Sequence, residues 1–201
     1  MPRANPINGG PWGIMGGAFD PVHYGHLILA EQAGQVCHLA GVLFVPSFQP
    51  PHRDRAPVAS FEDRVEMTRL ATDDNDGFVV SDIERDLDGP GYTLKLVDRL
   101  RQEYPQVEWS VILGTDNIAL FDQWYKPEEL VNVARIVVGN RPGFEHEYKN
   151  SEWADRVEEF AMPMIDISAT RIRQRVAAGD SIRYLVPESI RRYVGEKGLY
   201  R

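Results

Sequence analysis

Short apolar segments alternate along this chain with segments in which apolar residues recur every three or four positions. The apolar segments predict buried strands, and the recurring pattern predicts helices that place one face on a core. The predicted strands are residues 12–17, 41–46, 78–84, 107–114, 135–140 and 164–167. The predicted helices are residues 26–40, 60–71, 94–104, 128–134, 144–160, 168–178 and 187–195.

This alternation also predicts the fold class. Strands that are separated by helices form an α/β fold, here a doubly wound, mostly parallel, Rossmann-like sheet with helices on both faces. We expect residues 1–11 to form a flexible lead-in and residues 12–201 to form one domain. Sheets of this kind bind ligands at the carboxyl ends of their strands, so we expect the functional residues to gather there.

Composition narrows the class of partner. The chain has 201 residues, 43% of them hydrophobic, and a formal net charge of −8, which disfavours a nucleic-acid polymer as partner and favours small molecules. The apolar runs fall short of the roughly 20 residues that span a membrane. The single cysteine, Cys37, lies in an apolar helical pattern and predicts a buried, inert thiol. One cysteine fits a reducing cytoplasm, and a homo-oligomer is compatible with the sequence.

The densest group of candidate residues is the segment GGAFDPVHYGH at residues 16–26. It follows the first predicted strand and precedes the first predicted helix, where α/β folds hold phosphates. Gly16 and Gly17 leave backbone N–H groups unshielded. His23 and His26 are three residues apart, so their side chains share one face of the helix start. The pattern predicts donors that face an anionic ligand.

Other interpretations of this segment have specific requirements. A redox dinucleotide site requires G-x-G-x-x-G and a Walker loop requires G-x-x-x-x-G-K-[ST], and the segment has neither. A zinc site requires a third ligand and usually a fourth, for which no H-E-x-x-H or cysteine pair is present. Two buried structural histidines remain an alternative to phosphate binding.

Seven further motifs follow in order along the chain: PPHR (50–53), GYT (91–93), GTDN (114–117), QWY (123–125), RPG (141–143), ISATRIR (167–173) and a closing segment at 185–201. Together with H-x-G-H they resemble the bacterial nicotinate-nucleotide adenylyltransferases. These belong to the nucleotidyltransferase superfamily, which shares H-x-G-H with class I aminoacyl-tRNA synthetases. The resemblance implies adenylyl transfer from ATP to nicotinate mononucleotide, giving nicotinate adenine dinucleotide and pyrophosphate in NAD biosynthesis.

The resemblance also implies the site residues. The catalytic residues are His23, His26 and Arg173. The ATP-binding residues are Gly16, Gly17, Ala18, Phe19, His23, His26, Gly114, Asp116, Arg141, Ser168, Thr170 and Arg173. The mononucleotide-binding residues are His52, Arg53, Tyr92, Thr93, Trp124 and Tyr125. Mg²⁺ is expected to enter with ATP and to be held mostly by phosphates and water rather than by protein ligands.

Physical arguments also address Asp20, Ser168 and Arg171. Asp20 is interpreted as a structural carboxylate that holds its turn, rather than as a metal ligand. Ser168 can cap a helix whose N-terminus adds a second anion site. Arg171 lies two residues before Arg173, so the two side chains should lie on different helix faces and only Arg173 is assigned to the site.

Alternative functions remain open at this stage. Adenylyl transfer to nicotinamide mononucleotide or to phosphopantetheine would use the same phosphate chemistry. The motifs GYT and QWY favour a pyridine acceptor, but the choice between acid and amide rests on the resemblance alone. A non-catalytic nucleotide sensor with this fold is a different class, and the intact H-x-G-H and ISATRIR motifs argue against it.

Overall fold

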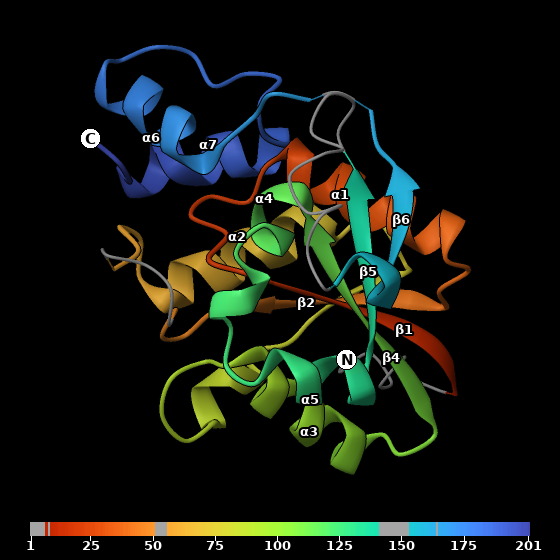
Figure 1. The fold of residues 1–201 in the computed structure, drawn as a ribbon. Coiled ribbons are helices and arrows are strands. Elements are labelled where there is room, and N and C mark those ends of the chain that lie inside the picture. Colours follow the sequence, from red (N-terminus) through yellow and green to blue (C-terminus); the bar gives the residue numbers. More distant parts are fainter. Residues whose placement is uncertain (1–6, 8, 51–55, 141–152, 164) are drawn as a thin grey trace.

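The fold is a six-stranded sheet with helices on both of its faces (Figure 1). The structure, a computed structural model, describes residues 7, 9–50, 56–140, 153–163 and 165–201. The strands are β1 (Gly10–Gly17), β2 (Gly41–Pro46), β3 (Phe78–Val80), β4 (Val107–Gly114), β5 (Arg135–Asn140) and β6 (Val157–Ala161). The α-helices are α1 (Tyr24–Val36), α2 (Phe61–Thr72), α3 (Thr93–Glu103), α4 (Thr115–Ile118), α5 (Pro127–Val133), α6 (Ala169–Ala177) and α7 (Glu188–Lys197).

The strand order is β3-β2-β1-β4-β5-β6, and every neighbouring pair is parallel. This is the doubly wound, Rossmann-like order, so the predicted fold class is confirmed. The chain moves outward from β1 to β3 on one side and then returns to β4 on the other side of β1. The carboxyl ends of β1 and β4 therefore flank the point at which the strand order reverses.

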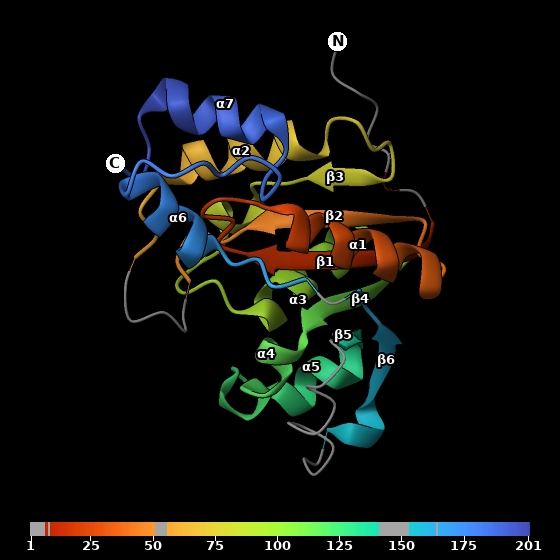
Figure 2. The same ribbon diagram turned by 90° about the horizontal axis from the view of Figure 1, so that it is seen from above.

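The central strands are buried on both faces, which explains their continuous apolar runs. Side chains alternate along a strand, so neighbouring residues enter different cores. Met15 of β1 and Phe44 of β2 belong to the core beneath α1, α2, α6 and α7. Ile14 and Leu43 belong to the core beneath α3 and α5. Figure 2 shows these helices on the two sides of the sheet, with α7 beside α2.

Several predicted boundaries are corrected by the structure. β1 begins at Gly10 rather than at residue 12, and α1 begins at Tyr24 and ends at Val36. β3 ends at Val80, and the rest of the predicted strand at 78–84 enters a 3-10 turn. These differences arise because apolar periodicity marks the buried part of an element, whereas its ends are set by capping and tertiary contacts.

The prediction for residues 144–160 is wrong where the structure describes it. A 3-10 turn at Ala154–Arg156 leads into β6, and residues 141–152 lie outside the described residues. β6 is an edge strand with only Phe160 buried, so it lacks the apolar run that marks the central strands. The strand predicted at 164–167 is not formed by its described residues, because the chain there already leads to α6.

The two ends of the chain also differ from the prediction. Most of the predicted lead-in at residues 1–11 lies outside the described residues, but Ile7 is buried and β1 already includes Gly10 and Pro11. At the other end, α7 continues past the predicted end at 195 to Lys197. Gly198 then ends the helix with a φ of 64°, a left-handed conformation that glycine adopts without a Cβ clash.

No helix within the described ranges has the length and apolar character needed to cross a bilayer.

Candidate active site

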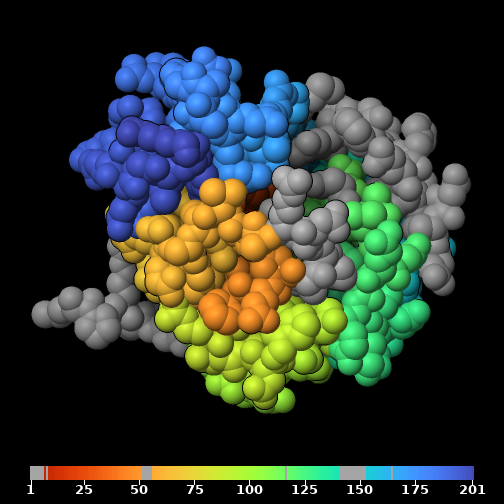
Figure 3. All heavy atoms as spheres, turned by 90° about the vertical axis from the view of Figure 1, so that its left-hand side faces the viewer, coloured from red at the N-terminus to blue at the C-terminus, as the bar shows by residue number. Residues whose placement is uncertain are grey.

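A cavity of about 560 Å³ opens at the carboxyl ends of the central strands. The glycines at the ends of β1 and β4 lie in its wall, together with the start of α1, the N-terminus of α6 and the segment before α5. Figure 3 shows this face hollowed between the orange, green and light-blue segments, with the dark red of the β1 end visible at depth. The cavity therefore occupies the ligand position expected where the strand order reverses.

Most of the predicted site residues line this cavity. They are Gly16, Gly17, Ala18, Phe19, His23, His26, Tyr92, Thr93, Gly114, Trp124, Tyr125, Ser168, Thr170 and Arg173. Three others, His52, Arg53 and Arg141, lie outside the described residues. Asp116 lies in α4, which begins directly after the cavity-lining Gly114, but the structure does not describe the Asp116 side chain. Residues 150 positions apart in sequence thus line one cavity.

The two histidines of H-x-G-H form a compact pair at the start of α1. His23 is the N-cap residue, with an extended backbone, and His26 lies in the first turn. Their rings stack with centroids 3.7 Å apart and an interplanar angle of 22°. His26 Nδ1 accepts a hydrogen bond from the His23 backbone N–H at 3.2 Å. The neutral His26 ring therefore carries its proton on Nε2, where it can donate to a ligand.

Asp20 is a structural carboxylate, as its position in the turn suggested. Its side chain is 2% exposed. Oδ2 accepts from the Val58 N–H at 2.8 Å, and Oδ1 accepts from the Ala59 N–H at 3.1 Å and the Tyr200 hydroxyl at 2.8 Å. The carboxylate thus joins the turn after β1 to the segment before α2 and to the residues after α7.

The N-terminus of α6 places polar groups at the opposite wall. Ser168 is the N-cap, and its Oγ accepts from the Arg171 N–H at 3.3 Å. Arg173 donates from one nitrogen to the Asp20 backbone carbonyl at 2.7 Å and from another to Thr170 Oγ1 at 3.2 Å. Backbone N–H groups at the helix start and the Arg173 guanidinium together favour an anion.

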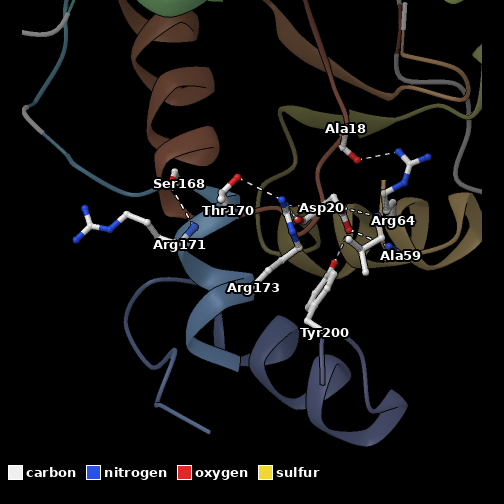
Figure 4. A network of polar contacts seen from close by, with 10 residues as sticks. Ala18, Asp20, Ala59, Arg64, Ser168, Thr170, Arg171, Arg173 and Tyr200 are labelled. Carbon is white, nitrogen blue, oxygen red and sulfur yellow. Dashed lines mark hydrogen bonds and ion pairs between the residues drawn. The ribbon is translucent and has the colours of Figure 1, made fainter. Parts of the chain in front are cut away.

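Arg171 and Arg173 lie on different faces of α6, as predicted. The Arg171 side chain is 63% exposed and pairs with Asp166, whereas that of Arg173 is 22% exposed and lines the cavity. Figure 4 shows Arg171 pointing away from Asp20 while Arg173 points toward it. Of these two arginines, Arg173 is therefore the one that is placed to contact a ligand in the cavity.

The remaining wall is aromatic. The rings of Tyr92 and Tyr125 stack with centroids 4.5 Å apart and an interplanar angle of 16°. Trp124 also lines the cavity, but its ring packs against Phe121 of the core at 5.2 Å. Thr93 begins α3, so its backbone N–H belongs to the free first turn of that helix. The aromatic shelf predicted from Trp124 and Tyr125 also includes Tyr92.

One cavity-lining carboxyl group, Glu84, was missed by sequence reasoning. It accepts a hydrogen bond from the Phe48 N–H at 2.9 Å and is 5% exposed. Burial raises the pKa of Glu84 to about 7, against the lowering effects of the Phe48 hydrogen bond and of the Arg64 charge. The sequence predicted only that Glu84 is the last residue of a strand at 78–84, so no local signal marked Glu84 as buried.

Arg64 and Tyr200 were also missed. Arg64 is fully buried in α2 and donates to the Ala18 carbonyl at 2.8 Å, which supports the turn after β1. Tyr200 reaches Asp20 from a position 180 residues later in the chain. An arginine in a helix and a tyrosine after a helix are both common on protein surfaces. Only their tertiary contacts therefore identify Arg64 and Tyr200 as supporting residues.

The sequence matches the cytidylyltransferase-like family over residues 14–175. It is 38% identical over 193 residues to a Herpetosiphon aurantiacus protein named "Probable nicotinate-nucleotide adenylyltransferase", covering 94% of this chain and 97% of that one. It is 40% identical over 196 residues to a protein of the same name from Desulfitobacterium hafniense strain DCB-2, covering 94% and 95%.

Solved structures share the fold. Plasmodium falciparum nicotinic acid mononucleotide adenylyltransferase complexed with NaAD superposes with a TM-score of 0.79 at 18% identity, covering 94% of this chain and 97% of that one. The same enzyme complexed with APC gives a TM-score of 0.75 at 17% identity, covering 94% and 96%.

Proposed function

This chain belongs to the nicotinate-nucleotide adenylyltransferase family, within the cytidylyltransferase-like proteins, and we propose that it transfers the adenylyl group of ATP to nicotinate mononucleotide. A phosphate oxygen of the mononucleotide bonds to the α-phosphorus of ATP, and the bond from that phosphorus to the β-phosphate bridging oxygen breaks. The products are nicotinate adenine dinucleotide and pyrophosphate. The observation that carries this proposal is the single cavity that joins the histidine pair, Arg173 and the Tyr92–Tyr125 stack.

The ATP side of the cavity works by position and charge. The attacking phosphate is already an anion at neutral pH, so the reaction needs no general base. His26 donates from Nε2 to the α-phosphate as its negative charge grows, with His23 stacked behind it. The N-terminus of α6 and Arg173 hold the leaving β- and γ-phosphates. Holding both anions in line supplies much of the rate enhancement.

The acceptor side recognises a flat ring that bears a carboxylate. The Tyr92–Tyr125 stack and Trp124 offer aromatic faces to the pyridine ring. The N–H and hydroxyl of Thr93, at the start of α3, are donors for the carboxylate. From the motif alone, we propose that His52 and Arg53 hold the mononucleotide phosphate.

Mg²⁺ enters the reaction as part of MgATP. Both oxygens of Asp20 already accept hydrogen bonds, so Asp20 does not fit a ligand role. Among the described residues, no three histidine, cysteine, aspartate or glutamate side chains come together as a metal site. We propose that the phosphates of ATP and water hold most of the ion's coordination positions, and that the ion screens charge on the phosphates.

We propose that the protein is cytoplasmic, because its one cysteine, Cys37, is a free thiol. Cys37 is buried, and burial raises the pKa of its thiol, so it is protonated and unreactive at neutral pH. This suits a reducing cytoplasm.

The decisive experiment measures pyrophosphate release from MgATP with three acceptors: nicotinate mononucleotide, nicotinamide mononucleotide and phosphopantetheine. A strong preference for the acid is expected. Equal use of acid and amide would keep the chemistry but contradict the Thr93 assignment. A preference for phosphopantetheine would favour the sibling activity instead.

The same assay of pyrophosphate release also distinguishes an enzyme from a non-catalytic nucleotide sensor. His23→Ala/His26→Ala should fold, as measured by circular dichroism, and lose roughly 10³-fold in kcat, because the transition-state donor His26 and the ring that stacks against it are both removed. Absence of pyrophosphate release with every acceptor, while ATP still binds, would favour the sensor.

A further inference from the structure

The Asp20 carboxylate is satisfied by donors from two distant segments. Oδ2 accepts from the Val58 N–H, and Oδ1 accepts from the Ala59 N–H and from the Tyr200 hydroxyl. Figure 4 shows Ala59 and Tyr200 beside Asp20. Three donors spread the charge of a buried anion that has little access to water. Tyr200 supplies the only side-chain hydroxyl among the three.

Arg173 contacts the same residue in a different way. Its guanidinium donates to the Asp20 backbone carbonyl at 2.7 Å, while the nearest distance from that nitrogen to the carboxylate Oδ2 is 3.8 Å. The guanidinium is therefore anchored by a neutral carbonyl oxygen and makes only a loose ion pair. A loosely paired guanidinium keeps its charge and its remaining donors for an anion in the cavity.

The loose ion pair between Arg173 and Asp20 depends on the three hydrogen bonds that the Asp20 carboxylate accepts from other residues. An ionised carboxylate that lacks hydrogen bonds is costly in a low-dielectric environment. A buried carboxylate that loses a donor is therefore stabilised most by a closer approach of the nearest cation. For Asp20 that neighbour is Arg173. Without the Tyr200 hydroxyl, the carboxylate would draw the guanidinium from the loose geometry into a close ion pair. Arg173 would then be withdrawn from the phosphates of a bound nucleotide.

Tyr200 is built to remain a donor at this point. It follows α7 with a φ of 66°, a left-handed conformation that bulky L residues rarely adopt and that surrounding contacts must enforce. Its ring is buried in the core beneath α1, α2, α6 and α7. Burial, and then the Asp20 charge, raise the pKa of the hydroxyl, so it stays protonated at neutral pH.

We propose that Tyr200 is a positioning residue for Arg173, and that it acts through the Asp20 carboxylate. The inference rests on the proposed adenylyl transfer, in which Arg173 holds the leaving phosphates. It assigns the residues after α7 a role in the reaction although they do not line the cavity.

Tyr200→Phe removes the hydroxyl and keeps the ring. We expect kcat/KM for ATP to fall about 10-fold, because Arg173 is drawn toward Asp20, and the KM for nicotinate mononucleotide to stay within about 2-fold, because the acceptor wall is unchanged. Tyr193→Phe is the matched control, since the Tyr193 hydroxyl also donates to a carboxylate at 2.8 Å, that of Asp63. It should leave both parameters near their wild-type values. Equal losses in the two variants, or none in Tyr200→Phe, would overturn the proposal.

A double-mutant cycle tests the route through Arg173. In an Arg173→Ala background, Tyr200→Phe should change kcat/KM for ATP by less than about 2-fold, because the group that it positions is gone. A full 10-fold loss in that background would show that Tyr200 acts by another route and would contradict the proposal.

Binding of inorganic pyrophosphate, measured by calorimetry, gives a readout that does not need turnover. Tyr200→Phe should weaken it about 10-fold and Tyr193→Phe should not. If wild type binds pyrophosphate in this way but transfers no adenylyl group, the proposed function fails and the inference stands. If Tyr200→Phe does not fold, Val58→Pro removes another donor to the same carboxylate and should produce the same loss; unchanged binding in the folded variant would contradict the inference.

Discussion

At the scale of single residues, Glu84 is held closely between two segments of the cavity wall. Its carboxylate accepts from the Phe48 N–H at 2.9 Å, and a Cβ placed on Gly91 would lie 2.4 Å from Oε2. A side chain at Gly91 would therefore displace the Glu84 carboxyl group, and glycine lets the backbone approach it closely. Because Tyr92 and Thr93 follow directly, Glu84 supports the segment that forms the acceptor side.

The pKa of Glu84 makes stability depend on pH. Its pKa is about 7 in the folded protein, against 4.5 for a solvated glutamate, so the folded state holds the proton more tightly. The resulting stabilisation is complete below about pH 4.5 and is lost as pH rises through 7. From pH 5 to pH 8, the unfolding free energy of wild type should fall by about 2 kcal/mol relative to Glu84→Gln.

Urea denaturation at pH 5, 6.5 and 8 measures this difference. Glu103→Gln, which removes an exposed carboxyl group of α3, is the control for a change in net charge. A constant difference between wild type and Glu84→Gln over this range would contradict the pKa of about 7.

At the scale of elements, α2 and α6 both begin with a serine N-cap, but the two caps differ in function. Ser60 caps α2 and accepts from the Asp63 N–H at 3.0 Å, and Ser168 caps α6 and accepts from the Arg171 N–H at 3.3 Å. Only Ser168 lines the cavity. The first cap stabilises a helix, whereas the second also presents a helix N-terminus to the ligand.

Substituting alanine for each capping serine should distinguish an effect on stability from an effect on activity. Ser60→Ala and Ser168→Ala should each lower the free energy of unfolding by about 1 kcal/mol. Ser168→Ala should in addition lower kcat/KM for ATP roughly 10-fold, because a donor to the phosphates is lost. Denaturation and steady-state kinetics on both variants check this. Equal activity in the two variants would remove Ser168 from the site.

Element types followed from the sequence where burial was strong. β2 and β5 begin and end where predicted, because β2 is buried along its whole length and the central residues of β5 form a buried apolar run. β6 was predicted as helix, because an edge strand with one buried residue has no alternation to detect. The Ser168 cap was predicted correctly, since a cap is a contact between residues three apart.

At the scale of the whole molecule, two cores share one sheet. Phe44 and Leu43 are neighbours in β2, yet the first is buried beneath α1 and the second beneath α3. Side chains of β1, β4 and β5 divide in the same way. Loss of either core would expose strands that the other core needs, so the two should unfold together.

Thermal unfolding should therefore show one transition. Phe44→Ala, in one core, and Leu100→Ala, in the other, should each lower stability by about 3 to 5 kcal/mol and shift that same transition. Calorimetry, together with circular dichroism at helical and aromatic wavelengths, measures this. Two separate transitions, each moved by only one of the variants, would contradict shared unfolding.

The sequence by itself determined the fold class, the loop after β1 and the polar start of α6, because each depends on neighbouring residues or on a repeating pattern. The histidine pair, Ser168 and the separation of Arg171 from Arg173 belong to this group. The tertiary structure alone decided that Glu84 is buried, that β6 completes the sheet and that Tyr200 donates to Asp20. The physical reason is distance along the chain. Burial of a carboxyl group and a hydrogen bond across 180 residues depend on how the elements pack, and local sequence carries no record of that packing.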